Sequence, residues 1–274
     1  MRKLLAALAI GLTTAVAIAP TATAQPAVES AGAVSLPQGP AEAWLLADLD
    51  TGRILASRNP YESHAPASSI KPLLAMVVLD NLRPENYARA NQSHTEVECS
   101  CVGLTPGQAY TTRQLLEALL TVSGNDAANM LADMLGGQRV AVAAMNRKAA
   151  AVGARATKAS SPSGLDGPGW ESNTTPHDLA VIYRAALSYP LIAQIFQERS
   201  AEFPGKTITS QNKLLTRYPG TIAGKTGFTN LAKDTFVAAA QRGNHRLVVV
   251  EMYGDGDLYG QATTLFDWGF SQYA

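Results

Sequence analysis

The sequence predicts an α+β fold in which an antiparallel sheet, built from segments near both termini, is flanked by helices. Two β-hairpin patterns, at residues 43–56 and 235–253, support the sheet. The segment between them is mostly apolar at helical spacing, which predicts the helices. A length of 274 residues is enough to bury a sizeable core in one large domain or two small ones.

The strands follow from turn sequences between apolar runs. Asp50-Thr51-Gly52 separates the two halves of the first hairpin, and Arg242-Gly243-Asn244 separates those of the second. The run Leu247-Val248-Val249-Val250 is typical of a buried central strand. The expected strands cover residues 43–49, 53–56, 235–240 and 246–253.

The helices are indicated by periodicity and by residues that begin or end helices. Thr112 is expected to cap one helix, and Thr175-Pro176 supplies a cap and a first-turn proline for another. Gly136-Gly137 and Gly153 end two more. The expected helices cover residues 70–82, 113–122, 125–135, 138–152, 178–187 and 261–270.

Residues 1–24 have the pattern of a secretory signal peptide. Arg2 and Lys3 precede an apolar run over 4–19, and Ala22-Thr23-Ala24 is a small-residue cleavage pattern. The run is shorter than the ~20 residues that span a bilayer, which favours cleavage over an uncleaved anchor. We therefore expect an exported protein, in a periplasm-like space, at the cell wall or secreted, with no membrane span in the mature chain.

The remaining residues divide into a linker and one folded domain. Residues 25–40 are rich in Pro, Gly, Ala and Ser, which is typical of a linker. We expect the domain over residues 41–274, with a sheet part at about 41–67 and 221–274 and a helical part at about 68–220.

Composition and charge exclude some classes of function. Basic and acidic residues number 22 each, and no basic stretch follows the first residues, so nucleic acid is not an expected partner. The two cysteines, Cys99 and Cys101, could pair in an oxidising compartment or remain free thiols. They supply only half a zinc site, and no metal or cofactor is expected.

Ser68 and Lys71 form a Ser-x-x-Lys pair at the start of the helix expected over 70–82. This spacing puts a hydroxyl and an amine one turn apart on the same helix face. The amine can accept the serine proton only when it is neutral, so burial or neighbouring cations must lower its pKa. The pair predicts a serine nucleophile with a lysine base, although the pattern alone is more often an ordinary helix start.

Two other short motifs follow in the chain. Ser123-Gly124-Asn125 interrupts two expected helices, which exposes a hydroxyl and an amide on a turn. Lys225-Thr226-Gly227 precedes the strand expected from Thr235, and its glycine allows a ligand close to the backbone. Each motif alone is weak. Their order, Ser-x-x-Lys, Ser-Gly-Asn and Lys-Thr-Gly, matches the motif set of penicillin-binding proteins and class A β-lactamases.

With these motifs the chain resembles the D-alanyl-D-alanine carboxypeptidases, the low-molecular-mass penicillin-binding proteins of the serine peptidase type. The resemblance covers residues 41–274, and its segment from Cys99 to Asn129 is most similar to actinobacterial, mycobacterial-type members. It also includes Asp48-Leu49-Asp50-Thr51-Gly52, Pro66-Ala67-Ser68 and Gly164-Leu165-Asp166.

The resemblance implies a fold and an activity. The fold is the β-lactamase/transpeptidase-like one, with an all-helical subdomain beside the sheet. The activity is removal of the terminal D-alanine from peptidoglycan stem pentapeptides through a Ser68 acyl-enzyme. β-Lactam antibiotics would be covalent inhibitors, and the biological role would lie in cell-wall biogenesis and cell shape.

The resemblance also implies a role for each motif residue. Ser68 is the expected nucleophile, Lys71 its base, and Ser123 the group that relays protons between Lys71, Lys225 and the leaving group. The backbone N–H groups of Ser68 and Phe228 form the expected oxyanion hole. Substrate binding is expected from Asn125, Lys225, Thr226, Gly227 and Phe228.

The chain departs from the family pattern in two places. Many relatives carry an arginine that pairs with the substrate carboxylate where this chain has Gln261, so Lys225 and Thr226 are expected to bind the carboxylate alone. Relatives with a longer tail carry a β-rich domain and an amphipathic anchor. This chain ends at Ala274, so membrane anchoring is not expected.

Two alternative functions remain open at this point. A class A β-lactamase needs a loop glutamate that activates the deacylating water, and Gly164-Leu165-Asp166 lacks one; Glu171 is the nearest. A non-catalytic domain that binds β-lactams or cell wall would not need the complete nucleophile and base pair. The balance of carboxypeptidase and endopeptidase action, and the oligomeric state, are left undecided by the sequence.

Overall fold

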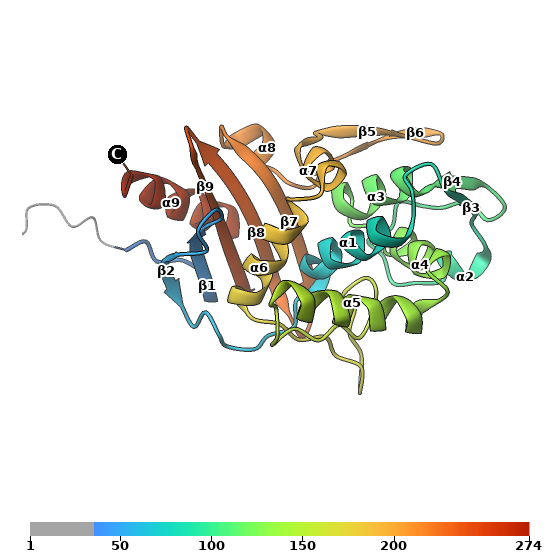
Figure 1. Ribbon diagram of the computed structural model, residues 1–274, viewed down its shortest axis with the longest axis horizontal. Helices are drawn as coiled ribbons and strands as arrows, with labels where there is room; N and C mark the ends of the chain where they lie inside the picture. The colour runs from blue at the N-terminus through green and yellow to red at the C-terminus, as the bar shows by residue number, and fades with distance from the viewer. Residues whose placement is uncertain (1–35, 274) are drawn as a thin grey trace, which may run out of the picture. The chain divides into compact units, whose positions relative to one another are not determined.

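The computed structural model describes residues 36–273, so the expected signal peptide and most of the expected linker lie outside the described residues. Within this range one five-stranded antiparallel sheet joins the two ends of the domain in the order β2-β1-β9-β8-β7 (Figure 1). This confirms the predicted antiparallel sheet. The strands are β1 (Ala41–Asp48), β2 (Ile54–Arg58), β7 (Thr221–Thr229), β8 (Lys233–Arg242) and β9 (His245–Gly254).

The central strand β9 separates two apolar cores. Its side chains alternate, so that Val248 and Val250 join the core shared with the helical part, whereas Leu247 and Val249 face helix α9 (Leu258–Ser271). Both faces of β9 are therefore buried, which explains its almost continuous apolar run. Helix α9 covers one face of the sheet, and the helical part covers the other (Figure 1).

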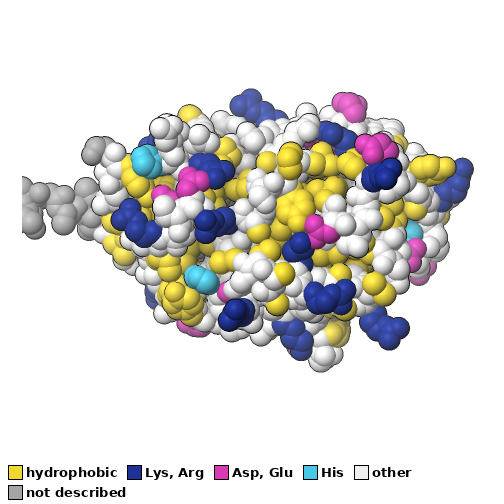
Figure 2. All heavy atoms as spheres, viewed as in Figure 1, with side chains coloured by type: hydrophobic (Ala, Val, Ile, Leu, Met, Phe, Trp, Pro, Cys, Tyr) yellow, Lys and Arg dark blue, Asp and Glu magenta, His cyan; other side chains and the backbone are white. Residues whose placement is uncertain are grey.

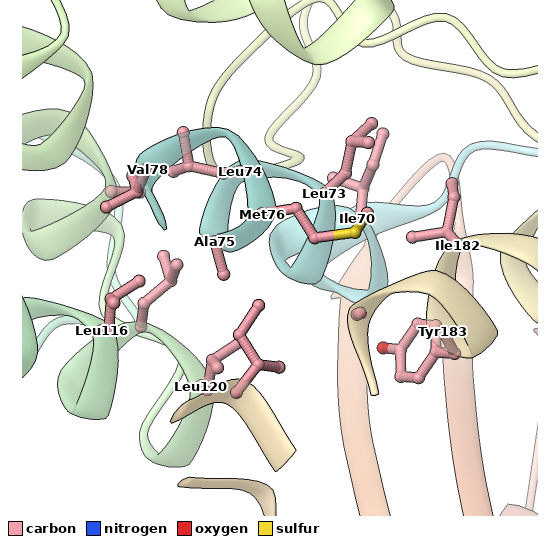
Figure 3. Close-up of a cluster of buried hydrophobic side chains, with 14 of the residues drawn as sticks. Ile70, Leu73, Leu74, Ala75, Met76, Val78, Leu116, Leu120, Ile182 and Tyr183 are labelled. Atoms are coloured by element: carbon pink, nitrogen blue, oxygen red, sulfur yellow. The ribbon is translucent and has the colours of Figure 1, made fainter. Parts of the chain in front are cut away.

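Helix α1 (Lys71–Asn81) lies at the centre of the helical part. Its side chains from Leu73 to Val78 are all buried, so it is apolar on every face instead of amphipathic. Figure 3 shows Leu116 and Leu120 of α3 and Ile182 and Tyr183 of α6 around it. The surrounding helices are α3 (Thr112–Thr121), α4 (Asn125–Met134), α5 (Gln138–Val152), α6 (Pro176–Ala186) and α7 (Pro190–Gln197).

The helical part also contains short elements that the sequence did not indicate. Two small sheets pair β3 (Tyr87–Arg89) with β4 (Ala109–Thr111), and β5 (Ser200–Phe203) with β6 (Lys206–Thr209). Strands this short carry too few residues for an alternating pattern to be recognised. Helix α7 and two short helices, α2 (Gln92–Thr95) and α8 (Leu214–Arg217), were likewise not indicated by the sequence.

The predicted N-terminal cap is confirmed for α6 and wrong for α3, and α9 begins earlier than predicted. Thr175 caps α6, as predicted, by accepting a hydrogen bond from the Asp178 backbone N–H at 3.1 Å. The cap of α3 is Thr111 and not Thr112, because Thr111 and Gln114 form a reciprocal capping box. Helix α9 begins at Leu258, before the expected Gln261, because the Asp257 side chain caps it.

The surface of the described part is mixed in character. On the face drawn in Figure 2, Lys and Arg side chains are scattered among acidic and apolar ones. Over residues 36–273, no single helix is both long and apolar enough to cross a membrane, and α6 with α7 reach such a length only as a pair bent by 106°.

Candidate active site

Three motifs that are far apart in the sequence converge on one cavity. It lies where the helical part meets β7, the edge strand of the sheet, and has a volume of about 460 Å³. The short 3₁₀ helix Ala67–Ile70 brings in Ser68, and the break between α3 and α4 brings in Ser123 and Asn125. The predicted site residues that line the cavity are Ser68, Ser123, Asn125, Thr226, Gly227 and Phe228.

The Lys71 amine contacts a hydroxyl or amide of each of the first two motifs. Its Nζ lies 2.6 Å from Ser68 Oγ, 3.1 Å from Ser123 Oγ and 2.7 Å from Asn125 Oδ1. The spacing of Ser68 and Lys71 thus produces the side-by-side placement that the sequence predicts. At 2.6 Å a neutral amine can accept the hydroxyl proton directly.

The surroundings of Lys71 favour its neutral form. Complete burial lowers its pKa well below the ordinary lysine value, and the positive charge of Lys225 lowers it further. The carboxylate of Asp126 acts in the opposite direction. A lowered pKa favours the neutral amine, and only the neutral amine can accept the proton of the Ser68 hydroxyl.

The backbone around Ser68 is closely packed from two sides. Ala67 has a φ of 47°, a left-handed conformation that costs energy for a residue with a Cβ. A Cβ on Gly164 would lie 1.9 Å from the Ala67 carbonyl oxygen. A Cβ on Gly227 would lie 2.7 Å from the Ser68 backbone nitrogen, so only glycine lets β7 approach the serine this closely.

Ser123 is the residue at which the polypeptide turns between two helices. Its φ of 63° ends the helical path after α3, and α4 begins at Asn125. Positive φ at a residue other than glycine is uncommon and often marks a functional position. The turn directs the Ser123 hydroxyl to the Lys71 amine.

Lys225-Thr226-Gly227 precedes β8, as predicted, but it also lies inside β7, a strand that the sequence did not indicate. Lys225 is buried, and this burial lowers its pKa to about 7. Its Nζ donates a hydrogen bond to the Thr226 carbonyl oxygen at 2.6 Å. Lys225 therefore acts on Lys71 through charge, while Thr226 lines the open cavity.

Gln261, the position at which the resemblance led us to expect an arginine in relatives, does not line the cavity. It is buried in α9, and its Oε1 accepts a hydrogen bond from the Ala41 backbone N–H at 3.0 Å. Gly39 packs so closely on this side chain that a Cβ there would lie 2.2 Å from the Gln261 Cδ. Gln261 thus connects α9 to the start of β1.

The nearest glutamate to the Gly164-Leu165-Asp166 loop is also outside the cavity lining. Glu171 Oε1 accepts a hydrogen bond from the exposed Gly169 N–H at 3.1 Å, and Asp166 Oδ2 accepts one from Thr229 Oγ1 at 2.6 Å. Asp166 does line the cavity. This placement does not favour Glu171 as the base for a deacylating water.

Sequence reasoning missed several cavity residues. Glu98, Cys99 and Ser100 form part of the wall, and Asp126 accepts hydrogen bonds from the chain just after them. The available signals were the place of Asp126 directly after Ser123-Gly124-Asn125 and the family resemblance of the segments Cys99–Asn129 and Gly164-Leu165-Asp166. The other missed lining residues are Leu165, Asp166, Gln211, Thr229, Asn230 and Asp234.

A buried lysine against a serine hydroxyl, beside an open edge strand, defines an enzyme that transfers acyl groups through serine. Comparison with known proteins gives the family. The family model described as D-alanyl-D-alanine carboxypeptidase, peptidase S11, matches residues 30–256. The chain belongs to this family of serine peptidases, as the sequence predicted.

Individual relatives agree. The chain is 55% identical over 253 residues to D-alanyl-D-alanine carboxypeptidase DacB2 of Mycobacterium tuberculosis, covering 89% of this chain and 87% of the relative. A crystal structure of a D-alanyl-D-alanine carboxypeptidase from the same species matches with 55% identity and a TM-score of 0.85, over 88% of this chain and 95% of the other. Penicillin-binding protein 6B of Escherichia coli matches with 30% identity and a TM-score of 0.79, over 86% and 79%. The predicted fold class is confirmed.

Proposed function

We propose that the protein removes the terminal D-alanine from peptidoglycan stem pentapeptides through an acyl-enzyme on Ser68. The observation that carries the assignment of residues is the 2.6 Å contact between Ser68 Oγ and the buried Lys71 Nζ. The family and the printed name of the mycobacterial relative support the D-Ala-D-Ala bond as the target.

Acylation begins with proton transfer from Ser68 to the neutral Lys71 amine, and Ser68 Oγ attacks the carbonyl carbon of the penultimate D-alanine. Ser123, 3.1 Å from the Lys71 amine, passes the proton to the departing D-alanine nitrogen. The backbone N–H groups of Ser68 and Phe228 stabilise the oxyanion, at ~3 kcal/mol for a donor of this kind. Deacylation then transfers the acyl group to water.

Substrate orientation depends on the open edge of the sheet. β7 is an edge strand, so an extended peptide can pair beside it. Thr226 on that strand and the Lys225 charge behind it recognise the free carboxylate of the last D-alanine. Asn125, which also lines the cavity, holds the substrate amide. A free carboxylate at this place favours cleavage of the last residue.

β-Lactams enter the same cavity and acylate Ser68, because their strained amide resembles the D-Ala-D-Ala bond. Glu171 lies outside the cavity lining and is not placed to activate a deacylating water, which supports slow hydrolysis of the penicilloyl ester. We also propose that residues 1–24 are a signal peptide and that the protein is exported to the cell wall, a periplasm-like space or the medium. Its biological role would then lie in cell shape.

The test is release of free D-alanine from a stem pentapeptide ending in D-Ala-D-Ala, measured with the purified mature protein. We expect stoichiometric tetrapeptide and D-alanine, and none with Ser68→Ala. Rapid hydrolysis of benzylpenicillin without any D-alanine release would show a β-lactamase instead.

A further inference from the structure

A short segment beside the active site is closed by a disulfide and holds one of the site residues. We call residues 98–104 the strap. Cys99 and Cys101 form a disulfide within it, and Glu98, Cys99 and Ser100 line the catalytic cavity. We propose that the disulfide-closed strap is a positioning element for Asn125 and, through it, for the Lys71 amine. Reduction of the bridge therefore slows acylation of Ser68.

The first step in the argument is that the strap holds both ends of Asn125. The Asn125 backbone N–H donates to the Ser100 carbonyl oxygen at 2.8 Å. The Asn125 side-chain Nδ2 donates to the Glu98 carbonyl oxygen at 2.6 Å. The two acceptors lie on either side of Cys99. Together they fix the orientation of the amide, and this leaves Oδ1 facing Lys71 Nζ at 2.7 Å.

The second step is that the other end of the strap is fixed to the next residue of α4. The Asp126 carboxylate accepts hydrogen bonds from the backbone N–H groups of Val102, Gly103 and Leu104 at 2.9, 2.7 and 3.0 Å. Lys206 Nζ also donates to the Val102 carbonyl oxygen. The strap therefore meets α4 on both sides of the disulfide.

The third step concerns what keeps residues 98–101 in shape between these attachments. They belong to no helix or strand, and Glu98, Cys99 and Ser100 are exposed. Such a segment has many accessible backbone conformations, and a covalent ring around Ser100 removes most of them. The bridge thus limits the positions of the Glu98 and Ser100 carbonyl oxygens, on which the Asn125 amide depends.

The disulfide is accessible to a soluble reductant, because Cys99 is exposed and Cys101 is half-buried. A thiolate of a dithiol reductant attacks one sulfur, and a mixed disulfide forms while the other cysteine leaves as a thiolate. The second thiol of the reductant then resolves the mixed disulfide. The two cysteines gain two electrons and two protons, and the reductant becomes a cyclic disulfide.

The experiment measures the second-order rate of acylation by benzylpenicillin for the full-length mature protein, before reduction, after reduction and after reoxidation. Thiol titration counts the thiols at each stage. The Cys99→Ser/Cys101→Ser double variant, with and without reductant, is the matched control. We expect a loss of about 10- to 100-fold on reduction, the usual size for a displaced catalytic group, and full recovery on reoxidation. The variant should be equally slow and insensitive to reductant.

Two readouts separate positioning from a general loss of structure. The thermal midpoint of the reduced protein should stay within a few degrees of the oxidised one. The acid limb of the acylation pH profile should move to higher pH. Burial lowers the pKa of Lys71, so water that reaches its amine in the reduced protein raises that pKa again. If the double variant does not fold, reduction and reoxidation of the natural protein test the role of the strap without it.

The inference rests on the proposed function, and the outcomes keep the two apart. A reduced protein and a double variant that both acylate within twofold of the oxidised protein would overturn the role of the strap while leaving the function intact. An oxidised protein that neither acylates nor releases D-alanine would overturn both.

Discussion

Lys71 and Lys225 are two buried amines with lowered pKa values, yet the proposed acyl transfer requires them to have opposite charge states. Lys71 must be neutral to accept the Ser68 proton, and Lys225 must be charged to attract a carboxylate. Burial is the main cause of both shifts, and the Lys225 charge also lowers the pKa of Lys71. The pair titrates as a coupled system, so activity should be restricted to a pH window.

The pH dependence of kcat/KM for the pentapeptide tests this arrangement. The alkaline limb should lie at about pH 7, because the Lys225 charge disappears as the pH rises through its lowered pKa. In Lys225→Arg the guanidinium stays charged, so we expect this limb to move upward by at least two pH units. Rates from pH 5 to 10 check it, with Lys225→Gln as the control that lacks a charge throughout. An unchanged alkaline limb in the arginine variant would refute this role for Lys225.

The close placement of the candidate catalytic residues could be predicted from the sequence, because their spacing is short and local. Ser68 and Lys71 lie one helical turn apart, and Ser123 and Asn125 share one turn of the chain. Asp126 and the strap could not be predicted, because their role depends on hydrogen bonds across more than 20 residues of sequence. The sequence predicts that Gln261 lies on the last helix. It does not predict that Gln261 lies away from the cavity, because its contact with Ala41 joins opposite ends of the domain.

At the scale of elements, β9 carries a buried carboxyl group beneath α9. Glu251 is completely buried and lies opposite Trp44 and Phe236, which belong to the core shared with α9. Neither of its carboxyl oxygens has a hydrogen-bond partner within residues 36–273. Burial raises its pKa well above the ordinary value, and the nearby charge of Asp257 adds to this. Burial in the folded protein therefore favours the protonated form of Glu251.

The consequence is a stability that falls as the pH rises. Below the unfolded-state pKa of glutamate both states are protonated, and the stabilisation is complete. Above that unfolded-state pKa, the unfolded chain releases the Glu251 proton and the folded protein retains it. The free energy of unfolding therefore decreases by up to about 1.4 kcal/mol per pH unit, until the pH passes the raised pKa of Glu251 in the folded protein.

Glu251→Gln removes this titration at nearly constant volume. We expect the variant and the natural chain to unfold similarly at pH 4, and the variant to be more stable by about 1 to 3 kcal/mol at pH 8. Urea unfolding at both pH values measures the difference. Equal stability of the two proteins at pH 8 would mean that Glu251 is not held protonated.

The elements that could be predicted are those with strong local signals. The hairpin of β8 and β9 has a long apolar run and a clear turn, and α6 has a threonine cap with a proline. β7 was harder to recognise, because Gly224 and Gly227 interrupt its apolar pattern. Those same glycines permit close packing, since a Cβ on Gly224 would lie 2.3 Å from Asn212 Nδ2.

At the scale of the whole domain, the active site lies at the junction between the helical part and the sheet. Ser68 and Ser123 come from the helical part, and Lys225 comes from the edge strand. Local sequence patterns predict each of the three motifs but not the distances between them in the folded domain. The ordered set of three motifs predicted that they meet, because it matched a family in which they do so.

The central claim is that Ser68 is the nucleophile of a D-Ala-D-Ala carboxypeptidase. The most direct measurement is mass spectrometry of the intact protein after benzylpenicillin treatment, followed by peptide mapping and a time course. The account predicts a single penicilloyl adduct on Ser68 that persists for many turnovers of the pentapeptide and is missing in Ser68→Ala. An adduct on another serine, or drug hydrolysis so fast that no adduct accumulates, would contradict it.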